Sequence, residues 1–244
     1  MSQVLVTGAS GGIGGAISEA LARRGATVVL HYQSDRVAAE NTLKSLAGEG
    51  HRLLQADLSD PAAIERLWHE ASSAGPIEAL INNAGVFPDH PPLSTDYGQW
   101  TQAWRRTLAI NLEGAAHLSY WAAGAMSARG GGRIVSVSSR AAFRGELTAP
   151  AYAASKAGLN AFSQSLAKAL AHKAVYTFVV APGWVATARV AQAVQNPAVI
   201  ADQPLGRVAT PAEVADVVTY CALDAPASMT GAILDVNGAS YLRS

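Results

Sequence analysis

Short apolar runs rich in Val, Ile and Leu alternate with longer segments of helical period along most of this chain of 244 residues. The runs cover residues 3–7, 26–31, 51–56, 77–81, 133–138, 175–181 and 232–236. Apolar residues recur at helical spacing in Gly12–Arg24, Arg36–Ala47, Pro61–Ala74, a stretch near 99–128, Pro150–His172 and Pro211–Ala222. Alternating strands and helices form βαβ crossovers, which build a parallel sheet with helices on both faces. The pattern predicts a doubly wound, Rossmann-type α/β fold with a seven-stranded parallel sheet.

The chain contains no low-complexity linker, charge block or internal repeat beyond the βα unit, which favours a single domain over residues 1–244. The last helix has a clear start signal in Thr210-Pro211-Ala212-Glu213. Thr stands at the N-cap, Pro at the first helical position and Glu at the third, which is the pattern of a capping box.

Charge and cysteine content exclude several classes of protein. Lys plus Arg (18) equals Asp plus Glu (18), so no net field attracts nucleic acid or an anionic membrane. The single cysteine, Cys221, cannot form an internal disulfide, and we expect it to pack on a helix. No Cys or His cluster has metal-ligand spacing, so we expect a site without metal. With a strand run beginning near Val4, no signal peptide before it and no apolar run of about 18 residues, we expect a cytoplasmic protein.

A glycine-rich turn joins the first predicted strand to the first predicted helix. It reads Thr7-Gly8-Ala9-Ser10-Gly11-Gly12-Ile13-Gly14, with the spacing G-x-x-x-G-x-G. Gly8 permits a tight turn, Gly12 lets backbone approach a pyrophosphate, and Gly14 allows close packing of the helix, whose N-terminal amides face the anion. A purely structural turn is the alternative, since flexible turns also collect glycine. Its place between strand and helix favours dinucleotide binding.

Polar residues follow two further strand runs. Asp57 comes after the third run, and Asn82-Asn83-Ala84-Gly85 comes after the fourth. Both therefore lie at carboxyl ends of strands, where open α/β sheets bind ligands. We expect Asp57 to accept a hydrogen bond from an adenine amino group. The alternative for Asp57 is an N-cap or turn residue before the helix near Pro61, and the Asn-rich run has a similar turn alternative.

A Tyr and a Lys are positioned for acid–base chemistry. Tyr152 and Lys156 are four residues apart inside a predicted helix, so their side chains share one face. The lysine cation favours the phenolate and is expected to lower the tyrosine pKa from its reference value of about 10 toward working pH. Ser139 ends the strand run at 133–138, where its hydroxyl can hydrogen-bond a substrate oxygen. A surface Tyr resting against a Lys stem is the alternative for the pair.

These motifs, in this order and spacing, resemble the short-chain dehydrogenase/reductase family across essentially the whole chain. The matching residues are Thr7-Gly8-x-x-x-Gly12-x-Gly14, Asp57, Asn82-Asn83-Ala84-Gly85, Asn111, Ser139, Tyr152-x-x-x-Lys156 and Pro182-Gly183. The resemblance implies that Tyr152 exchanges the proton of the carbonyl oxygen and that Ser139 orients that oxygen. It implies that Lys156 binds the nicotinamide ribose and that Asn111 holds a water of a proton relay.

The resemblance also implies a cofactor site, with Thr187 near the nicotinamide carboxamide. Its expected members are Gly8, Ser10, Gly11, Gly12, Ile13, Gly14, Tyr32, Gln33, Ser34, Asp57, Leu58, Asn83, Ala84, Gly85, Tyr152, Lys156, Pro182, Gly183, Val185 and Thr187. Two positions depart from the usual family pattern. Gly11 stands where a basic residue is common, and Ala174-Val175-Tyr176-Thr177-Phe178 replaces a Gly-Ile-Arg-Val-Asn-like run.

The end of the second strand bears on the choice of cofactor. Members that prefer NAD usually carry an acid there, which binds the ribose 2′-hydroxyl and repels a 2′-phosphate. This chain has Tyr32, followed by Gln33, Ser34 and Arg36, which can receive the phosphate. Asp35 argues for NAD if it turns inward, but we expect it to cap the next helix. We therefore expect NADP(H), with NAD(H) as the alternative.

The overall layout resembles bacterial 3-oxoacyl-acyl-carrier-protein reductases and their relatives, which implies a ketone or acyl-thioester substrate. We expect pocket walls from Ala188–Arg207, Trp184 and Phe143. A basic rim of Arg129, Arg133 and Lys173 is a candidate docking surface for an acyl carrier protein.

Residues 88–103, with Tyr97, Trp100 and Trp104, either shape a private pocket or pack on the long helix. The histidines have no evident acid or metal partner in the sequence, so we assign them no chemistry. The resemblance further implies a homotetramer.

Three other readings remain open from the sequence. One is an NAD-dependent sugar or secondary-alcohol dehydrogenase, which differs in its cofactor preference. Another is a nucleotide-binding scaffold that has lost catalysis, against which the complete set of Asn111, Ser139, Tyr152 and Lys156 argues. The last is a structural assembly protein, which would bind no cofactor.

Overall fold

The computed structural model describes residues 2–191 and 196–243, and these form one parallel sheet between two layers of helices. The strand order is β3-β2-β1-β4-β5-β6-β7, and every neighbouring pair is parallel. The strands are β1 (Gln3–Val6), β2 (Thr27–Tyr32), β3 (Arg52–Gln55), β4 (Ile77–Asn82), β5 (Gly132–Val137), β6 (Val175–Pro182) and β7 (Ile233–Val236). The prediction of a doubly wound, seven-stranded Rossmann-type domain is confirmed.

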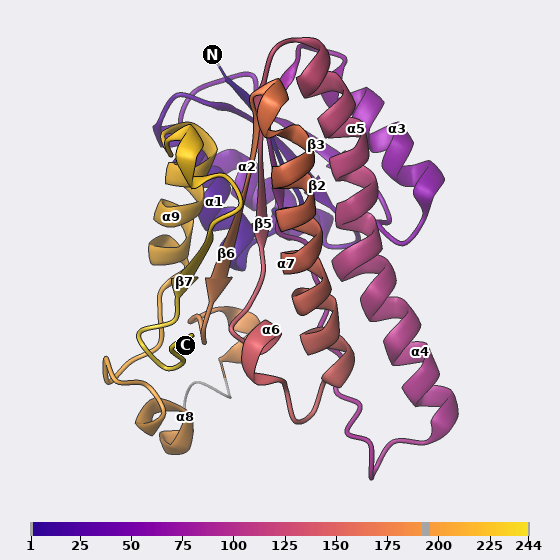
Figure 1. Cartoon of the computed structure of the whole chain (residues 1–244), viewed down its shortest axis with the longest axis vertical. Coiled ribbons are helices and arrows are strands. Elements are labelled where there is room, and N and C mark those ends of the chain that lie inside the picture. Colours follow the sequence, from indigo (N-terminus) through magenta and orange to yellow (C-terminus); the bar gives the residue numbers. More distant parts are fainter. Residues whose placement is uncertain (1, 192–195, 244) are drawn as a thin grey trace.

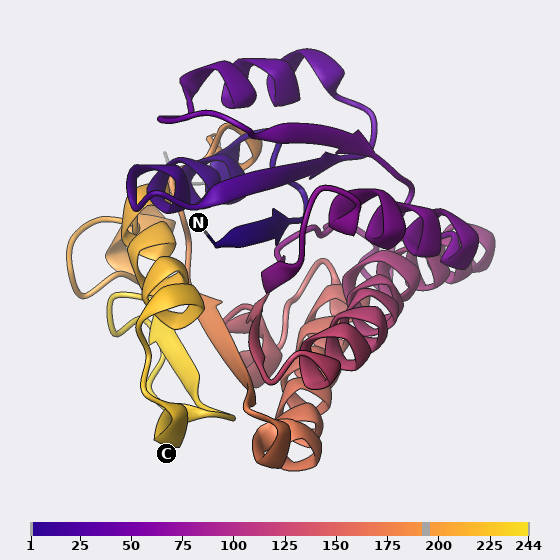
Figure 2. The same cartoon turned by 90° about the horizontal axis from the view of Figure 1, so that it is seen from above.

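Helices cover both faces of the sheet, as Figures 1 and 2 show from two directions. One layer holds α1 (Gly12–Arg23), α2 (Arg36–Ser45) and α9 (Pro211–Leu223). The other holds α3 (Pro61–Ser72), α5 (Gly114–Ala128) and α7 (Pro150–Leu170), with α4 (Tyr97–Leu108) extending from α5 along α7. Two short helices, α6 (Ala141–Arg144) and α8 (Pro197–Ala201), follow β5 and β6.

The two layers bury two separate cores because side chains alternate between the faces of a strand. On β1, Val4 and Val6 belong to the core under α1 and α9, while Leu5 belongs to the core under α3 and α5. Cys221 is fully buried on α9, and burial raises the pKa of its thiol to about 11. The expectation that it packs on a helix is confirmed.

Helix ends follow the sequence signals. Thr210 accepts a hydrogen bond from the backbone of Glu213, whose side chain accepts one from the backbone of Thr210, so the predicted capping box is present. Asp35 caps α2 by accepting from the Ala38 amide at 2.9 Å. This confirms its expected role and removes it as an inward-facing acid.

The long helical stretch predicted near 99–128 contains a defect that the periodicity does not reveal. A π turn, η1 (Ala109–Glu113), joins α4 to α5 and contains Asn111. Such turns insert one extra residue into a helix and are frequent at functional sites.

The carboxyl ends of the strands meet at one edge of the sheet, below the arrowheads of β6 and β7 in Figure 1. The segment after β6 leaves the sheet here, and Val185 pairs with Ala209 where it returns toward α9. Both α6 and α8 lie at this edge. Among the described helices, none is both long enough and apolar enough to cross a membrane.

Candidate active site

The turn between β1 and α1 has a geometry that requires glycine. Gly8 has φ +65°, and a Cβ at this position would stand 2.9 Å from Cα of Ala84. A Cβ at Gly14 would stand 2.1 Å from the carbonyl oxygen of Gly8, which is far inside van der Waals contact. The two glycines therefore let the turn, the start of α1 and the end of β4 approach one another. This is the cradle expected for a pyrophosphate at a helix N-terminus.

Side chains from β4 and β1 lock this turn in place. Nδ2 of Asn83 donates to the carbonyl oxygens of Thr7 at 2.9 Å and Gly8 at 3.1 Å. Oγ1 of Thr7 accepts from the backbone amides of Asn83 at 2.9 Å and Ala84 at 3.0 Å. The predicted residue Asn83 thus supports the glycine loop through its side chain. The role of Thr7 was missed, although it stands next to the glycine motif.

His31, to which the sequence assigns no chemistry, also supports the loop. Its ring lies at the end of β2 and is 2% exposed. Nδ1 accepts from the Gly8 amide at 3.2 Å, so the other nitrogen, Nε2, carries the hydrogen and donates to the carbonyl oxygen of Ala56 at 3.1 Å. Burial lowers the pKa of His31 from 6.5 to about 4, which keeps the ring neutral. A polar residue inside an apolar strand run was the only sequence signal.

The predicted adenosine end gathers around the ends of β2 and β3. Oδ1 of Asp57 accepts from the Ser59 amide at 2.9 Å and from its hydroxyl at 2.7 Å, and these bonds hold the pKa of Asp57 below its usual range. Asp57 therefore stabilises the turn after β3 through Oδ1, and Asp60 caps α3; a contact of Asp57 with adenine stays a prediction. Gln33 accepts at its backbone oxygen from Nε2 of Gln55 at 2.9 Å.

Arg36, expected near a 2′-phosphate, is exposed and pairs with Glu40 at 2.8 Å in the first turns of α2. Tyr32 is buried at the end of β2. The remaining carboxylate in this loop, Asp35, is occupied in capping α2.

Lys156 and Tyr152 lie on one face of α7, as their spacing predicts. Nζ of Lys156 is 5.7 Å from the centre of the Tyr152 ring and donates to the carbonyl oxygen of Val137 at 2.8 Å. Ser138 donates from Oγ to the carbonyl oxygen of Lys156 at 3.3 Å. These two bonds attach α7 to the end of β5, where Ser139 is the next residue. The Phe87 ring packs edge-on against Tyr152 at 4.7 Å.

Asn111 connects this pair to the loop after β4. Oδ1 of Asn111 accepts from the Val86 amide at 2.8 Å, and Nδ2 donates to the Val86 carbonyl oxygen at 3.0 Å and to Oγ of Ser155 at 3.2 Å. A Cβ at Gly85 would stand 3.4 Å from Oδ1 of Asn111 and 3.6 Å from Nζ of Lys156. The predicted residues Gly85, Asn111 and Lys156 therefore converge at one point.

His90 is a second histidine that sequence reasoning missed. It is fully buried, and its Nε2 accepts from the Ala151 amide at 3.1 Å, in the first turn of α7. Nδ1 donates to the carbonyl oxygen of Pro88 at 2.8 Å. Ala149, at the N-cap of α7, offers no side-chain cap, so His90 satisfies an amide that α7 leaves open. The helix that carries Tyr152 and Lys156 is thus capped from outside.

The segment at 88–103 mainly packs against itself and α7. The Trp100 ring lies edge-on to His90 at 5.4 Å and is 5.9 Å from the Trp104 ring. Tyr97 is 81% exposed. The sequence left two alternatives for this segment, a private pocket or packing on the long helix. The contacts of Trp100 and Trp104 fit packing.

The segment after β6 brings its predicted residues back over the glycine loop. A Cβ at Gly12 would stand 3.5 Å from Cγ2 of Thr187, so these two predicted residues are neighbours. Pro182 ends β6 and accepts at its oxygen from the Arg140 amide at 2.8 Å. Gly183 donates to the carbonyl oxygen of Val236, and Val185 is buried in its bridge to Ala209. For all the residues of the expected cofactor site, including Ser10, Gly11, Ile13, Ser34 and Leu58, contact with a cofactor stays a prediction.

The expected basic rim is not at this edge. Arg133 lies at the start of β5, and Lys173 precedes the start of β6, so both belong to the opposite edge of the sheet from Ser139. Arg129 donates to the carbonyl oxygen of Ile77, and Arg133 donates to that of Cys221 at 2.9 Å. The three residues therefore do not adjoin Ser139, and their expected role in docking an acyl carrier protein stays a prediction.

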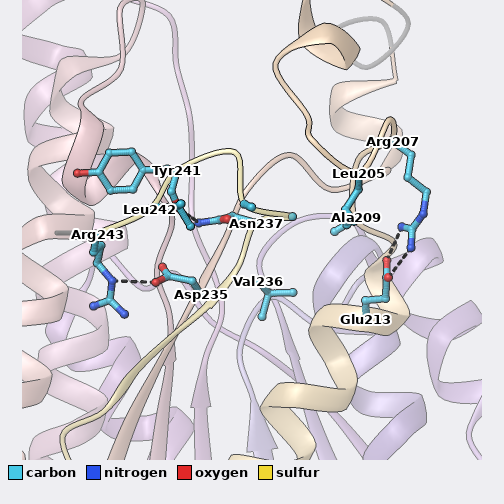
Figure 3. A pocket seen from close by; sticks show the side chains of 12 residues that line it. Leu205, Arg207, Ala209, Glu213, Asp235, Val236, Asn237, Tyr241, Leu242 and Arg243 are labelled. Carbon is cyan, nitrogen blue, oxygen red and sulfur yellow. Dashed lines mark hydrogen bonds and ion pairs between the residues drawn. The ribbon is translucent and has the colours of Figure 1, made fainter.

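A pocket of about 500 Å³ lies apart from these residues, between the C-terminal tail and the start of α9. Figure 3 shows the pair Arg207–Glu213 on one side of it and Arg243–Asp235 on the other. The predicted catalytic residues do not line it. Among the described residues, no group of three or more His, Cys, Asp or Glu is arranged to hold a metal ion.

Comparison with known proteins identifies the family of this chain. The family model for short chain dehydrogenases matches residues 2–198. The chain therefore belongs to the short-chain dehydrogenase/reductase family, whose members are oxidoreductases that bind a nicotinamide cofactor.

Similar proteins include enzymes with different substrates. The chain is 36% identical to a cis-4-hydroxycyclohexanecarboxylate dehydrogenase of Sinomonas cyclohexanicum, over 96% of this chain and 94% of the relative. It is 35% identical to a 3-oxoacyl-acyl-carrier-protein reductase of Escherichia coli (strain K12), over 98% and 96%. A solved structure of a candidate NAD(P)-dependent gluconate 5-dehydrogenase from Beutenbergia cavernae, with NADP at low occupancy, has a TM-score of 0.87 at 32% identity, over 97% of this chain and 95% of that one.

Proposed function

We propose that this protein interconverts a ketone and a secondary alcohol, using NADP(H) and Tyr152 as the general acid and base. The observation that carries the proposal is the convergence of Tyr152, Lys156 and Asn111 at the carboxyl end of β5, beside the glycine cradle. A family match alone would not identify the residues that act.

The residues of the cradle fit a dinucleotide. Gly8, Gly12 and Gly14 keep the turn free of side chains, and Asn83 with His31 holds its backbone from two strands. The bound nicotinamide would supply or accept the hydride. Thr187, next to Gly12, is suited to hold the carboxamide end.

The chain's own residues handle the proton. During reduction, the Tyr152 hydroxyl donates its proton to the carbonyl oxygen, and Ser139 donates a hydrogen bond to the same oxygen. The ammonium of Lys156, held by the Val137 oxygen, favours the phenolate that remains. Asn111 attaches the π turn to Val86 and Ser155 through hydrogen bonds. These bonds would hold Asn111 in a fixed position for the proton relay beside Lys156.

NADP(H) is favoured because no acid is available for the ribose 2′-hydroxyl at the end of β2. Tyr32 occupies the usual position, and Asp35 is engaged in capping α2. Arg36 pairs with the exposed Glu40, and exposed pairs of this kind contribute little, so a 2′-phosphate can compete for the guanidinium.

Two substrate classes are candidates. A 3-oxoacyl thioester, free or on an acyl carrier protein, follows from the likeness to the reductases, which include an acetoacetyl-CoA reductase of Allochromatium vinosum at 35% identity. A secondary alcohol on a compact hydroxy acid follows from the likeness to the cyclohexanecarboxylate and gluconate enzymes.

We propose a cytoplasmic enzyme, assembled as a homotetramer; a monomeric mass in solution would contradict the assembly.

The first experiment compares NADPH and NADH oxidation by the purified protein with acetoacetyl-CoA and with 4-oxocyclohexanecarboxylate. The same assay on Tyr152→Phe tests the mechanism, with cofactor binding followed by fluorescence. We expect the variant to bind NADPH normally and to lose at least about 1,000-fold in kcat. Turnover by Tyr152→Phe at the rate of the unaltered protein would exclude Tyr152 as the acid and base.

A further inference from the structure

A buried arginine follows directly after the serine of the proposed reaction centre. Arg140 follows Ser139 in the chain, and its backbone amide donates to the oxygen of Pro182 at 2.8 Å. It is therefore fixed between the serine expected to orient the carbonyl oxygen and the segment expected to meet the cofactor. Its side chain is only 8% exposed.

Two guanidinium groups share one carboxylate oxygen here. Oδ2 of Asp202 accepts from Nη1 of Arg140 at 3.5 Å and from Nη1 of Arg144 at 3.2 Å. A guanidinium carries five N–H donors, and within residues 2–191 and 196–243 the hydrogen bonds seen for these two groups use one N–H of each. Burial and the charge of Arg144 lower the pKa of Arg140, while Asp202 and Glu146 act in the opposite direction.

The shared carboxylate comes from the segment that crosses the carboxyl edge of the sheet. Asp202 ends α8, in the excursion that leaves after β6 and returns at the Val185–Ala209 bridge. Arg140 precedes α6 and Arg144 ends it, so the two ion pairs connect α6 to the end of α8. Asp202 is 51% exposed, so its own side chain is accessible to water.

The short helix that ends at Arg144 also carries an aromatic side chain. Phe143, also on α6, stacks on Tyr241 at 6.2 Å and is covered by the guanidinium of Arg243 at 4.9 Å. The C-terminal tail thus holds α6 in place from the outside. α6 and the residue before it therefore combine an aromatic ring with two cations, which suits a small ligand with an apolar body and an anionic end.

We propose that Arg140 and Arg144 bind a carboxylate of the substrate, and that Asp202 occupies this position between turnovers. The inference rests on the proposed ketone–alcohol chemistry and selects the compact hydroxy acid or oxo acid from its two substrate classes. A planar guanidinium binds a carboxylate through two parallel hydrogen bonds, which an oxygen shared at 3.5 Å and 3.2 Å does not achieve. The substrate carboxylate would replace Asp202 as the partner of the buried Arg140, so the exchange leaves no buried cation unpaired, and the half-exposed Asp202 returns to water.

The position of Arg140 limits where the carboxylate can be. Because Arg140 is the residue after Ser139, a carboxylate bound to its guanidinium lies about the length of one arginine side chain from the backbone of Ser139. The phosphates of coenzyme A stand at the far end of the pantetheine arm and cannot meet this condition in the same pose. The inference therefore concerns an acid group on the reacting molecule itself.

Binding can be measured apart from turnover. Calorimetry on the Tyr152→Phe protein with NADP⁺ compares cyclohexanecarboxylate and butanoate with their neutral carboxamides. We expect each acid to bind at least about tenfold more tightly than its amide, as a charge-assisted hydrogen bond implies, and Arg140→Gln to abolish the difference. Arg144→Gln, on the exposed side, is expected to reduce it if Arg140→Gln does not fold. Arg66→Gln, on α3, is the matched control and should retain the preference.

Substitution of Asp202 distinguishes a substrate-binding role of the two arginines from a purely structural role of their ion pairs. If Asp202 competes with the substrate, Asp202→Asn should tighten binding of the acids by about threefold or more, whereas Arg140→Gln weakens it. A structural role for the ion pairs predicts that both substitutions act in the same direction.

Equal binding of acids and amides, absence of acid binding, or weaker acid binding by Asp202→Asn would each overturn the subsite. A different result would contradict the proposed function: the protein would bind the acids but would oxidise NADPH with none of the ketones.

Discussion

His90 caps the helix that carries Tyr152: its Nε2 accepts a hydrogen bond from the Ala151 amide at 3.1 Å, one residue before the proposed acid. The bond crosses from the loop after β4 to the first turn of α7. It joins the loop after β4 to the helix that carries Tyr152 and Lys156. His90 is therefore a positioning residue for Tyr152.

We expect His90→Phe to keep the packing against Trp100 but to lose the acceptor for Ala151. Loss of a cap should lower the free energy of unfolding by about 1 kcal/mol. A displaced Tyr152 should lower kcat by about tenfold, with little change in the Kd for NADPH. His90→Gln, which restores an acceptor, should recover most of kcat; a loss of stability alone, with kcat unchanged, would contradict the positioning role.

Gly14 is expected to tolerate no side chain. Its added Cβ would lie 2.1 Å from the Gly8 oxygen and 2.6 Å from Nδ2 of Asn83, so the start of α1 or the cradle must move. We expect Gly14→Ala to abolish NADPH binding or to prevent folding, as measured by fluorescence titration and thermal melting. Gly124→Ala, in α5 with open space around it, is the control and should stabilise the protein by about 0.5–1 kcal/mol.

His31 makes stability depend on pH. Burial lowers its pKa from 6.5 to about 4. Between these two values, His31 is protonated in the unfolded chain and stays neutral in the folded protein. Its contribution is therefore complete above pH 6.5 and is lost as pH falls from 6.5 to about 4, amounting to about 3 kcal/mol.

Denaturant unfolding across this range, compared with His31→Gln, measures the effect. The difference between the two proteins should change by this amount as pH falls. A difference independent of pH would show that His31 titrates normally.

Arg36 is expected to decide between the two cofactors. Arg36→Gln should weaken NADPH binding by about tenfold and leave NADH unchanged, because the 2′-phosphate loses a charge-assisted partner. Glu40→Gln removes the competing carboxylate seen at 2.8 Å and should tighten NADPH binding slightly. Equal effects of Arg36→Gln on both cofactors would contradict a 2′-phosphate site in this loop.

Local features of the sequence determined most of the framework. The seven strands follow from apolar runs, the start of α9 from Thr210 and Glu213, and the shared face of Tyr152 and Lys156 from their spacing. These features depend on contacts between residues close in sequence, so local periodicity and hydrogen bonding suffice to predict them.

Only the tertiary structure decided the remaining features. His31 meets Gly8 across 23 residues, His90 meets Ala151 across 61, and Arg140 meets Asp202 across 62. No local pattern specifies these pairings, because each depends on which loops the sheet brings to its carboxyl edge. The π turn at Asn111 is a further feature that the sequence did not predict, because helical periodicity does not reveal a single inserted residue. A polar side chain acquires its partner only when the chain has folded, which is why the sequence assigned these histidines and Arg140 no role.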